Sequence, residues 1–595
     1  MKSIAFTALA AFLNVVCVHA ASAKQGPNIV FILTDDQDKL MGSLDYMPNV
    51  KEHLTDKGVI YERHYCTVAL CCPSRVSLLT GRAAHNTNVT DIIPPYGGYT
   101  KFTEEGLNDN YLPVWLQNAG YSTYYAGKLM NGHATLNYNM PFAKGFNQSS
   151  FILDPGQYVY MNSTWQTGTG VPENFPGKHI LDINNERAFA YLDDAAEKDV
   201  PFFLTIAPVA PHAQVIVDLD NPQIENRNIS APVPQAKWNT SFLDEKVPRT
   251  PNFNPDVASG GSWIRDLPQL DADTVAYNDA FYVARLQLLA GLDEMVGELV
   301  SRLNASGLLE STYIVYTTDN GFHIGQHRLQ PGKSCPIEED YIVPLIIRGP
   351  NVPAGKVVNT VTTHTDLAPT FFEMLGIDMR PEFDGAPIPV TNTQISSASE
   401  DSAQTEHIDM EYWGNLNARN EGNSGSTTPT NNTYKAARVI GTNYNVFYTV
   451  WCDNSHELYD MKADPYQMND LLGASNASSD FTSSLSVSTV ASSAVNSTAR
   501  APAPGSTQAS VTHDIPQLVR RLDSLTMVLK SCKADACRSP WSVLHPQGDV
   551  QNLEDAMARK YDAFYASQPK ASFSECQPGY ILEAEGPQSV IPYSG

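Results

Sequence analysis

Residues 28–36 read Asn-Ile-Val-Phe-Ile-Leu-Thr-Asp-Asp, an apolar, β-favouring run that ends in two adjacent carboxylates. Similar short runs recur along the chain, at Ser122–Tyr125, Phe202–Ile206, Thr312–Tyr316 and Val343–Ile347. None of them alternates with polar residues, and helical patterns such as Asp273–Leu303 separate them. Strands of this kind are typical of a sheet that is buried on both faces. The sequence therefore predicts an α/β fold with a large, mostly parallel central sheet flanked by helices.

The 595 residues suggest more than one domain. We predict a signal peptide at 1–23, a catalytic α/β domain at 24–395 and a polar surface insertion at 396–433, where Ser, Thr and Asn dominate. A smaller C-terminal α+β subdomain follows at 434–595, with strand-like and helical stretches at 434–450, 456–460 and 519–529. Within it, residues 473–512 are rich in Ser, Ala and Thr, and this composition favours a flexible segment.

The N-terminus indicates secretion. Lys2, the apolar run Ile4–Val18 and small residues up to Ala23 are the parts of a signal peptide, with cleavage after Ala20 or Ala23. A buried first helix is the alternative. No later stretch is long enough to cross a bilayer. We expect an extracellular or cell-wall location, or a lysosome- or vacuole-like compartment. Sequons for N-glycosylation fit this route, at Asn88, Asn147, Asn162, Asn228, Asn239, Asn304, Asn431, Asn476 and Asn496.

The charge balance is strongly acidic, with 39 Lys and Arg against 64 Asp and Glu and a formal net charge of −25. Such a surface repels nucleic acid and anionic lipid, so we expect neither as a partner. An anionic substrate must be held by a local cluster of cations. Cysteines are sparse, and Cys532 and Cys537 are the plausible local disulfide pair.

Polar side chains follow four of the predicted strands. Asp35-Asp36, Lys128, His212 and Asp319-Asn320 come directly after them or a few residues later. Because ligands of open α/β sheets bind beyond the carboxyl ends of the strands, we expect these groups to form one site. The carboxylate and amide oxygens favour Ca²⁺ or Mg²⁺ over zinc. The alternative is that Asp-Asp and Asp-Asn-Gly are ordinary turns.

A second feature is the segment Cys71-Cys-Pro-Ser-Arg-Val-Ser-Leu-Leu-Thr-Gly-Arg82. Pro73 suits the start of a short helix and Gly81 suits the residue after its end, which places Cys71 at the helix N-terminus. The helix dipole disfavours a cation in the first turn, so Arg75 needs an anionic partner. The alternative for adjacent cysteines is simple burial or a disulfide.

The pattern Cys71-x-Pro-Ser-Arg-x-x-x-Leu-Thr-Gly-Arg82 resembles the signature of the type I sulfatases, within the alkaline-phosphatase-like superfamily. The resemblance covers about residues 27–472 and is greatest to fungal arylsulfatases. Cys71-Cys72 and the Gly127–Asn131 stretch are also similar to N-acetylglucosamine-6-sulfatase. Other matching landmarks are Asn28–Asp36, Asp319-Asn320-Gly321, Gly332-Lys333, Asp366–Thr370 and Glu457–Asp460.

The resemblance implies a mechanism and a set of site residues. Cys71 would be converted by a formylglycine-generating enzyme into formylglycine (3-oxoalanine), whose hydrated aldehyde is the nucleophile. A single Ca²⁺, with Mg²⁺ as the alternative, would be bound by Asp35, Asp36, Asp319, Asn320 and the modified Cys71. Arg75 would brace the nucleophile and the metal. Lys128 and Lys333 would hold sulfate oxygens, and His212 would bind sulfate or protonate the departing alcohol.

One position departs from the family pattern. Many relatives carry a histidine two residues after the active-site lysine, where this chain has Met130. Asn131 or His133 could fill that space. His323 and His327 either line the substrate mouth or pack in a loop, and His85 could be structural.

The resemblance favours a secreted arylsulfatase that hydrolyses small sulfate monoesters of phenols. One alternative is a sulfatase of sugar or glycosaminoglycan 6-sulfates, whose polymeric substrates fit the acidic surface less well. Another is a phosphodiesterase or phosphonate hydrolase on the same fold. A protein that only binds anions is the last alternative, and it has no need of an oxidisable cysteine.

Overall fold

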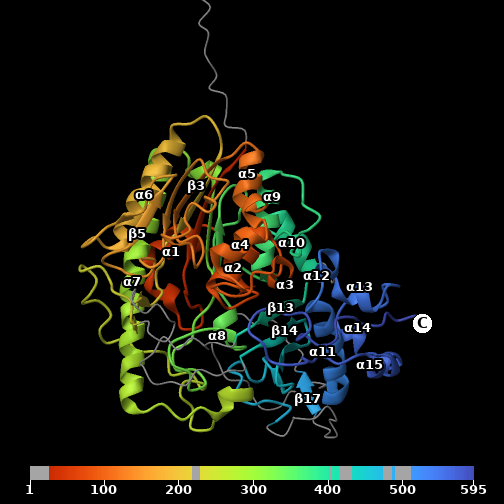
Figure 1. Ribbon diagram of the computed structural model, residues 1–595. Coiled ribbons are helices and arrows are strands. Elements are labelled where there is room, and N and C mark those ends of the chain that lie inside the picture. The colour runs from red at the N-terminus through yellow and green to blue at the C-terminus, as the bar shows by residue number, and fades with distance from the viewer. Residues whose placement is uncertain (1–25, 218–227, 401–404, 415–431, 474–485, 490–510) are drawn as a thin grey trace, which may run out of the picture.

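A computed structural model describes residues 26–217, 228–400, 405–414, 432–473, 486–489 and 511–595 (Figure 1). The predicted signal peptide at 1–23 lies outside the described residues, as does most of the predicted flexible segment at 473–512. Among the described helices, none combines the length and the apolar character that crossing a bilayer requires.

The central sheet has ten strands in the order β12-β2-β11-β10-β1-β7-β3-β4-β5-β6. Its middle is parallel and consists of five neighbouring strands: β10 (Thr312–Thr318), β1 (Asn28–Thr34), β7 (Phe202–Ala207), β3 (Ser122–Gly127) and β4 (Gln148–Ile152). The flanking strands are β12 (Lys356–Thr363), β2 (Val59–Tyr65), β11 (Leu345–Arg348), β5 (Thr164–Thr167) and β6 (Glu173–Asn174). The predicted mostly parallel sheet is confirmed.

One strand runs against the expected direction. The run Val343–Ile347 contributes to β11, which pairs antiparallel with β10 on one side and with β2 on the other. The chain reaches β11 from β10 through a loop and the short helix α8 (Glu338–Tyr341). This connection does not carry the chain back to the opposite end of the sheet, so β11 runs antiparallel to β10. A crossover that does so is what makes neighbouring strands parallel.

Helices cover both faces of the sheet. In β1, Ile29 and Phe31 pack into one apolar cluster and Val30 and Ile32 into another. The first cluster includes residues of α2 (Cys71–Thr80), α5 (Leu112–Asn118) and α9 (Leu367–Leu375), and the second those of α6 (Ile180–Ala196) and α7 (Ala272–Ala305). Figure 1 shows α6 and α7 on one side of the sheet and α5 and α9 on the other. Burial on both faces explains why the strands lack polar alternation.

A second, antiparallel sheet follows the order β13-β14-β15-β16, with β13 at His407–Tyr412, β14 at Tyr434–Ile440, β15 at Asn445–Trp451 and β16 at His456–Asp460. Helix α11 (Ile515–Leu529) packs Leu518 and Leu522 into the same apolar cluster as Val439 and Tyr448. The smaller C-terminal α+β unit is therefore present. Strand β13 lies inside the segment predicted as a polar insertion. Its apolar residues Ile408, Met410 and Tyr412 alternate with polar residues and are buried. The proposed boundaries at 395 and 433 stay predictions.

Shorter elements complete the described chain. They are α1 (Pro48–Val50), α3 (Ala84–Thr87), α4 (Gly98–Glu104), β8 (Gln214–Ile216), β9 (Asn228–Ser230), α10 (Asn392–Glu400), β17 (Ser486–Thr489), β18 (Val511–Asp514), α12 (Asp535–Arg538), α13 (Pro540–Leu544), α14 (Leu553–Ala556) and α15 (Asp562–Ser567). Two disulfides join described residues: the predicted Cys532–Cys537 pair and Cys452–Cys576, which ties the end of β15 to the C-terminal segment.

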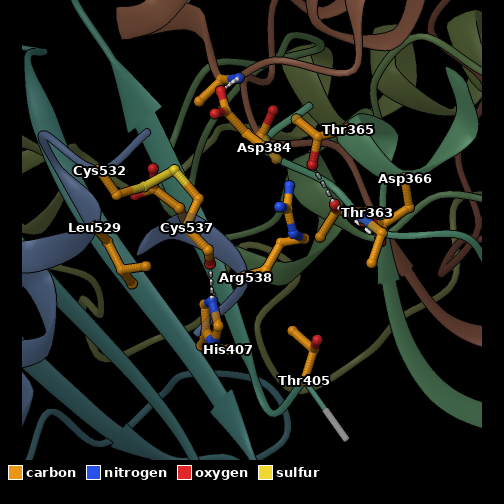
Figure 2. Close-up of a pocket in the computed structure, with 14 residues that line it drawn as sticks. Thr363, Thr365, Asp366, Asp384, Thr405, His407, Leu529, Cys532, Cys537 and Arg538 are labelled. Carbon is orange, nitrogen blue, oxygen red and sulfur yellow. Dashed lines mark hydrogen bonds between the residues drawn. A yellow bond between two sulfur atoms is a disulfide. The ribbon is translucent and has the colours of Figure 1, made fainter. Parts of the chain in front are cut away.

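A pocket lies at the seam between the two sheets. Figure 2 shows the Cys532–Cys537 disulfide on one side of it and Thr363 and Asp366 on the other. Arg538 also lines this pocket, and its guanidinium donates to the main-chain carbonyl of Phe383. None of the site residues predicted from the sequence lines it. The candidate active site is therefore elsewhere, at the carboxyl ends of the parallel strands.

Candidate active site

The groups that were predicted to converge lie together at one edge of the sheet. Asp35 and Asp36 follow β1, and Lys128 follows β3, which lies two strands away with β7 in between. The loop after β7 carries His212, and Asp319 and Asn320 follow β10. The register explains the convergence, because Thr34 at the end of β1 pairs with Thr318 at the end of β10.

Three buried carboxylates form the centre of the site, and each faces cations. Asp35 Oδ2 accepts from Lys128 Nζ at 2.7 Å, and Asp319 Oδ2 accepts from Arg75 Nε at 2.8 Å. Lys333 donates to Asp36 Oδ1. The six side chains have 0% exposure, so their charges interact with little screening by water. Arg75 therefore has the anionic partner that its position in the helix demanded.

The backbone holds this cluster in place. Asp36 adopts a φ of 65°, a left-handed conformation that residues other than glycine rarely occupy. Its main-chain N–H donates to Asp319 Oδ1 at 3.0 Å, and Asn320 Nδ2 donates to Asp36 Oδ1 at 2.8 Å. Non-glycine residues with such backbone strain concentrate at functional sites. The turns after β1 and β10 are thus tied to each other.

Helix α2 begins at Cys71 and ends before Gly81, whose φ of 67° suits a helix C-cap. Cys71 Sγ lies 3.5 Å from Asp35 Oδ1, 3.8 Å from Asp36 Oδ1 and 3.1 Å from Lys333 Nζ. Cys72, the next residue, belongs to the apolar core cluster. The two adjacent cysteines therefore have different surroundings, and Cys71 is the one in the site.

Burial and charge act on the ionisable groups in opposite directions. Burial raises the pKa of the Cys71 thiol, and Lys128 and Lys333 offset only part of that rise. For Asp319, burial also raises the pKa, but Arg75 and Lys128 outweigh it and the pKa falls well below its usual range. An unmodified Cys71 is thus a neutral thiol, whereas Asp319 keeps its negative charge.

His212 is held in a fixed orientation. Its Nδ1 lies 2.8 Å from the main-chain oxygen of Ala213, and its Nε2 lies 3.5 Å from Asp36 Oδ2. Its ring stacks on Tyr158, with ring centroids 4.0 Å apart. Sequence reasoning missed Tyr158, because this residue lies in an irregular stretch between β4 and β5 that carries no recognisable motif.

The groups considered for the missing histidine have distinct contacts. Asn131 Nδ2 donates to the Tyr158 hydroxyl at 2.8 Å. His133 is fully buried and stacks on Tyr99 at 4.1 Å, and burial lowers its pKa to about 3. Asn131 therefore contacts the residue that stacks on His212, while His133 is a neutral ring in an aromatic cluster.

The polar partners of His323, His327 and His85 lie outside the cluster around Cys71. His323 Nδ1 lies 2.7 Å from Asp340 Oδ1, and His327 Nδ1 lies 2.8 Å from Ser259 Oγ. Both are 1% exposed, which is as buried as the residues of the site itself, so the two alternatives for these histidines stay predictions. His85 bonds to Glu411 and to the main-chain oxygen of Cys532, as a structural residue would.

The predicted glycosylation sites differ in accessibility. Asn88 is partly buried and donates to Glu105 at 2.7 Å, whereas five others, Asn147, Asn162, Asn228, Asn239 and Asn304, are exposed. Asn431, Asn476 and Asn496 lie outside the described residues. Glycosylation stays a prediction at every sequon.

The residues present fit a hard divalent cation. Asp36 Oδ2 and Asn320 Oδ1 are buried acceptors without a hydrogen-bond partner among the described residues. An unpaired buried acceptor is costly, and both atoms belong to the predicted ligand set. Ligand atoms of Asp35, Asp36, Cys71 and His212 lie within 4.8 Å of one another. Carboxylate and amide oxygens are the donors that Ca²⁺ and Mg²⁺ prefer.

A mostly parallel sheet carries a helix-start cysteine beside buried carboxylates and cations at its carboxyl edge, an arrangement that suits the hydrolysis of an anionic ester. The family model described as Sulfatase matches residues 27–377. The chain belongs to the sulfatase family, and it is a sulfuric ester hydrolase.

Several relatives support this assignment. The protein named Sulfatase ppz1 of Metarhizium majus is 39% identical over 442 residues, which are 74% of this chain and 87% of that protein. A Volvox carteri arylsulfatase is 31% identical over 587 residues, 95% of this chain and 84% of the relative. An N-acetylglucosamine-6-sulfatase of Capra hircus is 26% identical over 550 residues, 88% and 86% of the two chains.

The fold also matches a solved structure. An enzyme in complex with its substrate D-glucosamine-2-N,6-O-disulfate superposes with a TM-score of 0.59 at 21% identity. The match covers 76% of this chain and 94% of that one. At this level of identity the likeness establishes the shared architecture.

Proposed function

We propose that this sulfatase is a secreted arylsulfatase, which converts an aryl sulfate and water into a phenol and sulfate. The observation that carries the proposal is the position of Cys71 Sγ, which is within 3.8 Å of two carboxylates and the Lys333 ammonium at the start of α2. Relatives named arylsulfatase span almost the whole chain and support the choice of aryl substrates.

We infer that Cys71 acts as formylglycine. The raised pKa of the buried thiol keeps it protonated at neutral pH, and a neutral thiol is a poor nucleophile. When formed, the hydrated aldehyde supplies one hydroxyl that attacks sulfur and a second whose proton loss releases sulfate and restores the aldehyde. Arg75 braces this position, because it links Asp319 to the main-chain oxygen of Lys128 at 2.7 Å.

The ligands of the proposed Ca²⁺ are Asp35, Asp36, Asp319, Asn320 and the modified Cys71. The ion would lower the pKa of the attacking hydroxyl and neutralise charge on the sulfate. Arg75 fixes Asp319, and Asn320 fixes Asp36 through its amide nitrogen, so that the oxygens of these residues stay together.

The substrate's sulfate would be held by the cations that border Cys71. Lys333 Nζ lies 3.1 Å from Cys71 Sγ, and Lys128 Nζ donates to Asp35, whose other carboxylate oxygen lies 3.5 Å from the same sulfur. Preorganised cations in a buried site stabilise the charge that develops as the sulfur–oxygen bond breaks. His212, fixed through Nδ1, would bind sulfate or deliver a proton from Nε2 to the departing phenol.

Turnover of three esters tests the reaction class and the substrate. We expect the purified enzyme to hydrolyse 4-nitrophenyl sulfate with a higher kcat/KM than glucosamine 6-sulfate or bis(4-nitrophenyl) phosphate. Dominant phosphodiester turnover would overturn the sulfatase mechanism. A higher kcat/KM for glucosamine 6-sulfate would support the alternative, a sugar 6-sulfatase. The similarity to N-acetylglucosamine-6-sulfatases is the observation in favour of that alternative.

Removal of divalent ions tests the metal. Treatment with a chelator, or the Asp319→Ala substitution, should suppress turnover by at least about a hundredfold, because the nucleophile loses its activating charge. Re-addition of Ca²⁺ should restore the activity of the chelated wild type and leave that of Asp319→Ala low. Full activity after both treatments would contradict a role for the metal.

A further inference from the structure

We propose that Tyr158 is a positioning residue for catalysis, which holds the His212 imidazole and the Lys128 ammonium in the arrangement that grips the sulfate. This inference rests on the proposed function of His212 and Lys128. It also gives a role to Asn131, which follows the departure from the family pattern at Met130, because Asn131 is the hydrogen-bond partner of Tyr158.

The Tyr158 ring contacts both His212 and Lys128, and its hydroxyl accepts a hydrogen bond from Asn131. The His212 ring lies 4.0 Å from the Tyr158 ring at an interplanar angle of 18°. Lys128 Nζ lies 5.0 Å from the centroid of the same ring. An aromatic ring attracts a cation near its face and restricts the tilt of a stacked imidazole. One side chain thus contacts both groups that are proposed to hold sulfate.

The main chain around Tyr158 reinforces the stack. The carbonyl of Tyr158 accepts from the N–H of Val215 at 3.2 Å, and the Tyr160 hydroxyl donates to the carbonyl of His212. The loop that carries His212 is therefore tied to the Tyr158 segment by two hydrogen bonds in addition to the ring stack. Such support is what keeps a catalytic group within a fraction of an ångström of its working position.

Asn131 connects this arrangement to the active-site lysine. It lies three residues after Lys128 and donates from Nδ2 to the Tyr158 hydroxyl at 2.8 Å. The side chain of Met130, in between, is fully buried in the apolar core. The Asn131–Tyr158 hydrogen bond thus fixes the rotation of the ring relative to the loop that carries Lys128.

A purely structural role would explain less. Tyr158 is 8% exposed and packs in an apolar cluster with Ile180 and Leu181, as any core tyrosine could. Core packing alone does not require the Tyr158 ring to stack on the His212 ring and also to have the Lys128 ammonium over its face. The two roles make different predictions for the kinetics of the folded enzyme.

The test compares Tyr158→Met, which keeps much of the volume but removes the aromatic face, with Tyr158→Phe, which keeps the face. Turnover of 4-nitrophenyl sulfate is measured per molecule of formylglycine. We expect Tyr158→Met to lower kcat/KM by about tenfold or more and to raise the inhibition constant of inorganic sulfate. Tyr158→Phe should stay within about threefold of wild type, because only the bond to Asn131 is lost.

Tyr191→Met is the matched control. Tyr191 is a similarly buried tyrosine, 5% exposed, whose ring faces Tyr124 and whose hydroxyl bonds to Ser150. The Tyr191→Met substitution should lower thermal stability without changing KM or the inhibition constant of sulfate. A Tyr158→Met enzyme with wild-type kcat, KM and sulfate inhibition would overturn the proposed role of Tyr158 and leave the proposed function untouched. A wild type without sulfatase turnover would overturn the proposed function itself.

A double-mutant cycle covers the case in which Tyr158→Met does not fold. Asn131→Ala and Tyr158→Phe each remove the same hydrogen bond, so the double variant should be no slower than the slower single variant. Fully additive losses in kcat/KM would contradict the proposed link between Lys128, Asn131 and Tyr158.

Discussion

Cys71 and Cys72 are neighbours in sequence and differ in chemistry because of what surrounds each sulfur. Cys71 Sγ faces carboxylates and Lys333, whereas Cys72 is fully buried in the apolar core. The first turn of α2 directs the two side chains to different sides of the helix. Only the first of them is placed to react.

Substitution of the two cysteines should therefore give opposite results. We expect Cys71→Ala to abolish turnover, by at least about a thousandfold, with the fold intact. Cys72→Ala should remain active and lose on the order of 1 kcal/mol of stability, because it removes one small buried group. Rates with 4-nitrophenyl sulfate and thermal midpoints check both. Loss of turnover in Cys72→Ala together with retention in Cys71→Ala would reverse the assignment.

The sequence predicted most residues of this cluster because each follows a strand or belongs to a short motif. Asp35, Lys128 and Asp319 could be placed at one edge without any knowledge of side-chain contacts. Tyr158 could not, since its importance comes from a stack on His212, which is 54 positions away along the chain. The role of Asn131 depends on the same contact.

At the scale of elements, close approach between strands sets the position of Lys128. Gly127 ends β3 with a φ of 124°, and a Cβ there would lie 2.0 Å from the main-chain oxygen of Ala207 in β7. The next N–H, of Lys128, donates to that same oxygen at 2.8 Å. A glycine at 127 lets β3 and β7 stay paired up to Lys128.

Gly127→Ala should separate the two strands at this point. We expect it to destabilise the protein by more than about 2 kcal/mol and to lower turnover, because it combines a steric clash with backbone strain. Gly120→Ala is the control: its φ is 91° and no atom lies within 4 Å, so only strain of about 1 kcal/mol is added. Equal thermal midpoints for the two variants would contradict the role of the close contact.

The elements themselves were largely predictable. The strand after residue 27 and the long helix α7 follow from apolar runs and helical spacing. The direction of β11 did not follow, because an apolar run has the same appearance in either orientation. Strand β13 was not predicted, because its short apolar alternation is flanked by polar residues on both sides.

At the scale of the whole molecule, a buried network of charges joins the two sheets. His85 Nδ1 lies 2.9 Å from Glu411 Oε2 in β13, and Lys435 of β14 bonds to the same carboxylate at 3.0 Å. Burial lowers the pKa of His85, but Glu411 outweighs it and raises this pKa to about 9. His85 is therefore a cation at neutral pH and stabilises the seam.

This shift predicts a pH-dependent stability. A histidine whose folded-state pKa is raised contributes fully below its unfolded value of 6.5 and loses that contribution as pH rises through about 9. Compared with His85→Gln, the wild type should be more stable by on the order of 3 kcal/mol near pH 6. This difference in stability should shrink as the pH rises and should be nearly gone by about pH 9.5. Urea midpoints across this range check it, and a constant difference would contradict the charged pair.

The division of the chain between two sheets also bears on maturation. The signature helix α2 lies in the N-terminal part, and the seam that covers its far end is closed by C-terminal residues such as Cys532 and Ala534. Because Cys71 is only 2% exposed in the folded protein, the conversion proposed for it would have to take place before the residues around it finish packing. Modification is therefore expected on a chain that has not yet completed its fold.

The mass of the peptide that contains residue 71, measured on secreted and active enzyme, tests the central assignment most directly. Conversion of the thiol to an aldehyde predicts a peptide about 18 Da lighter than the encoded sequence, in a fraction that rises in proportion to specific activity. Fully active enzyme whose peptide keeps the encoded mass would contradict the account.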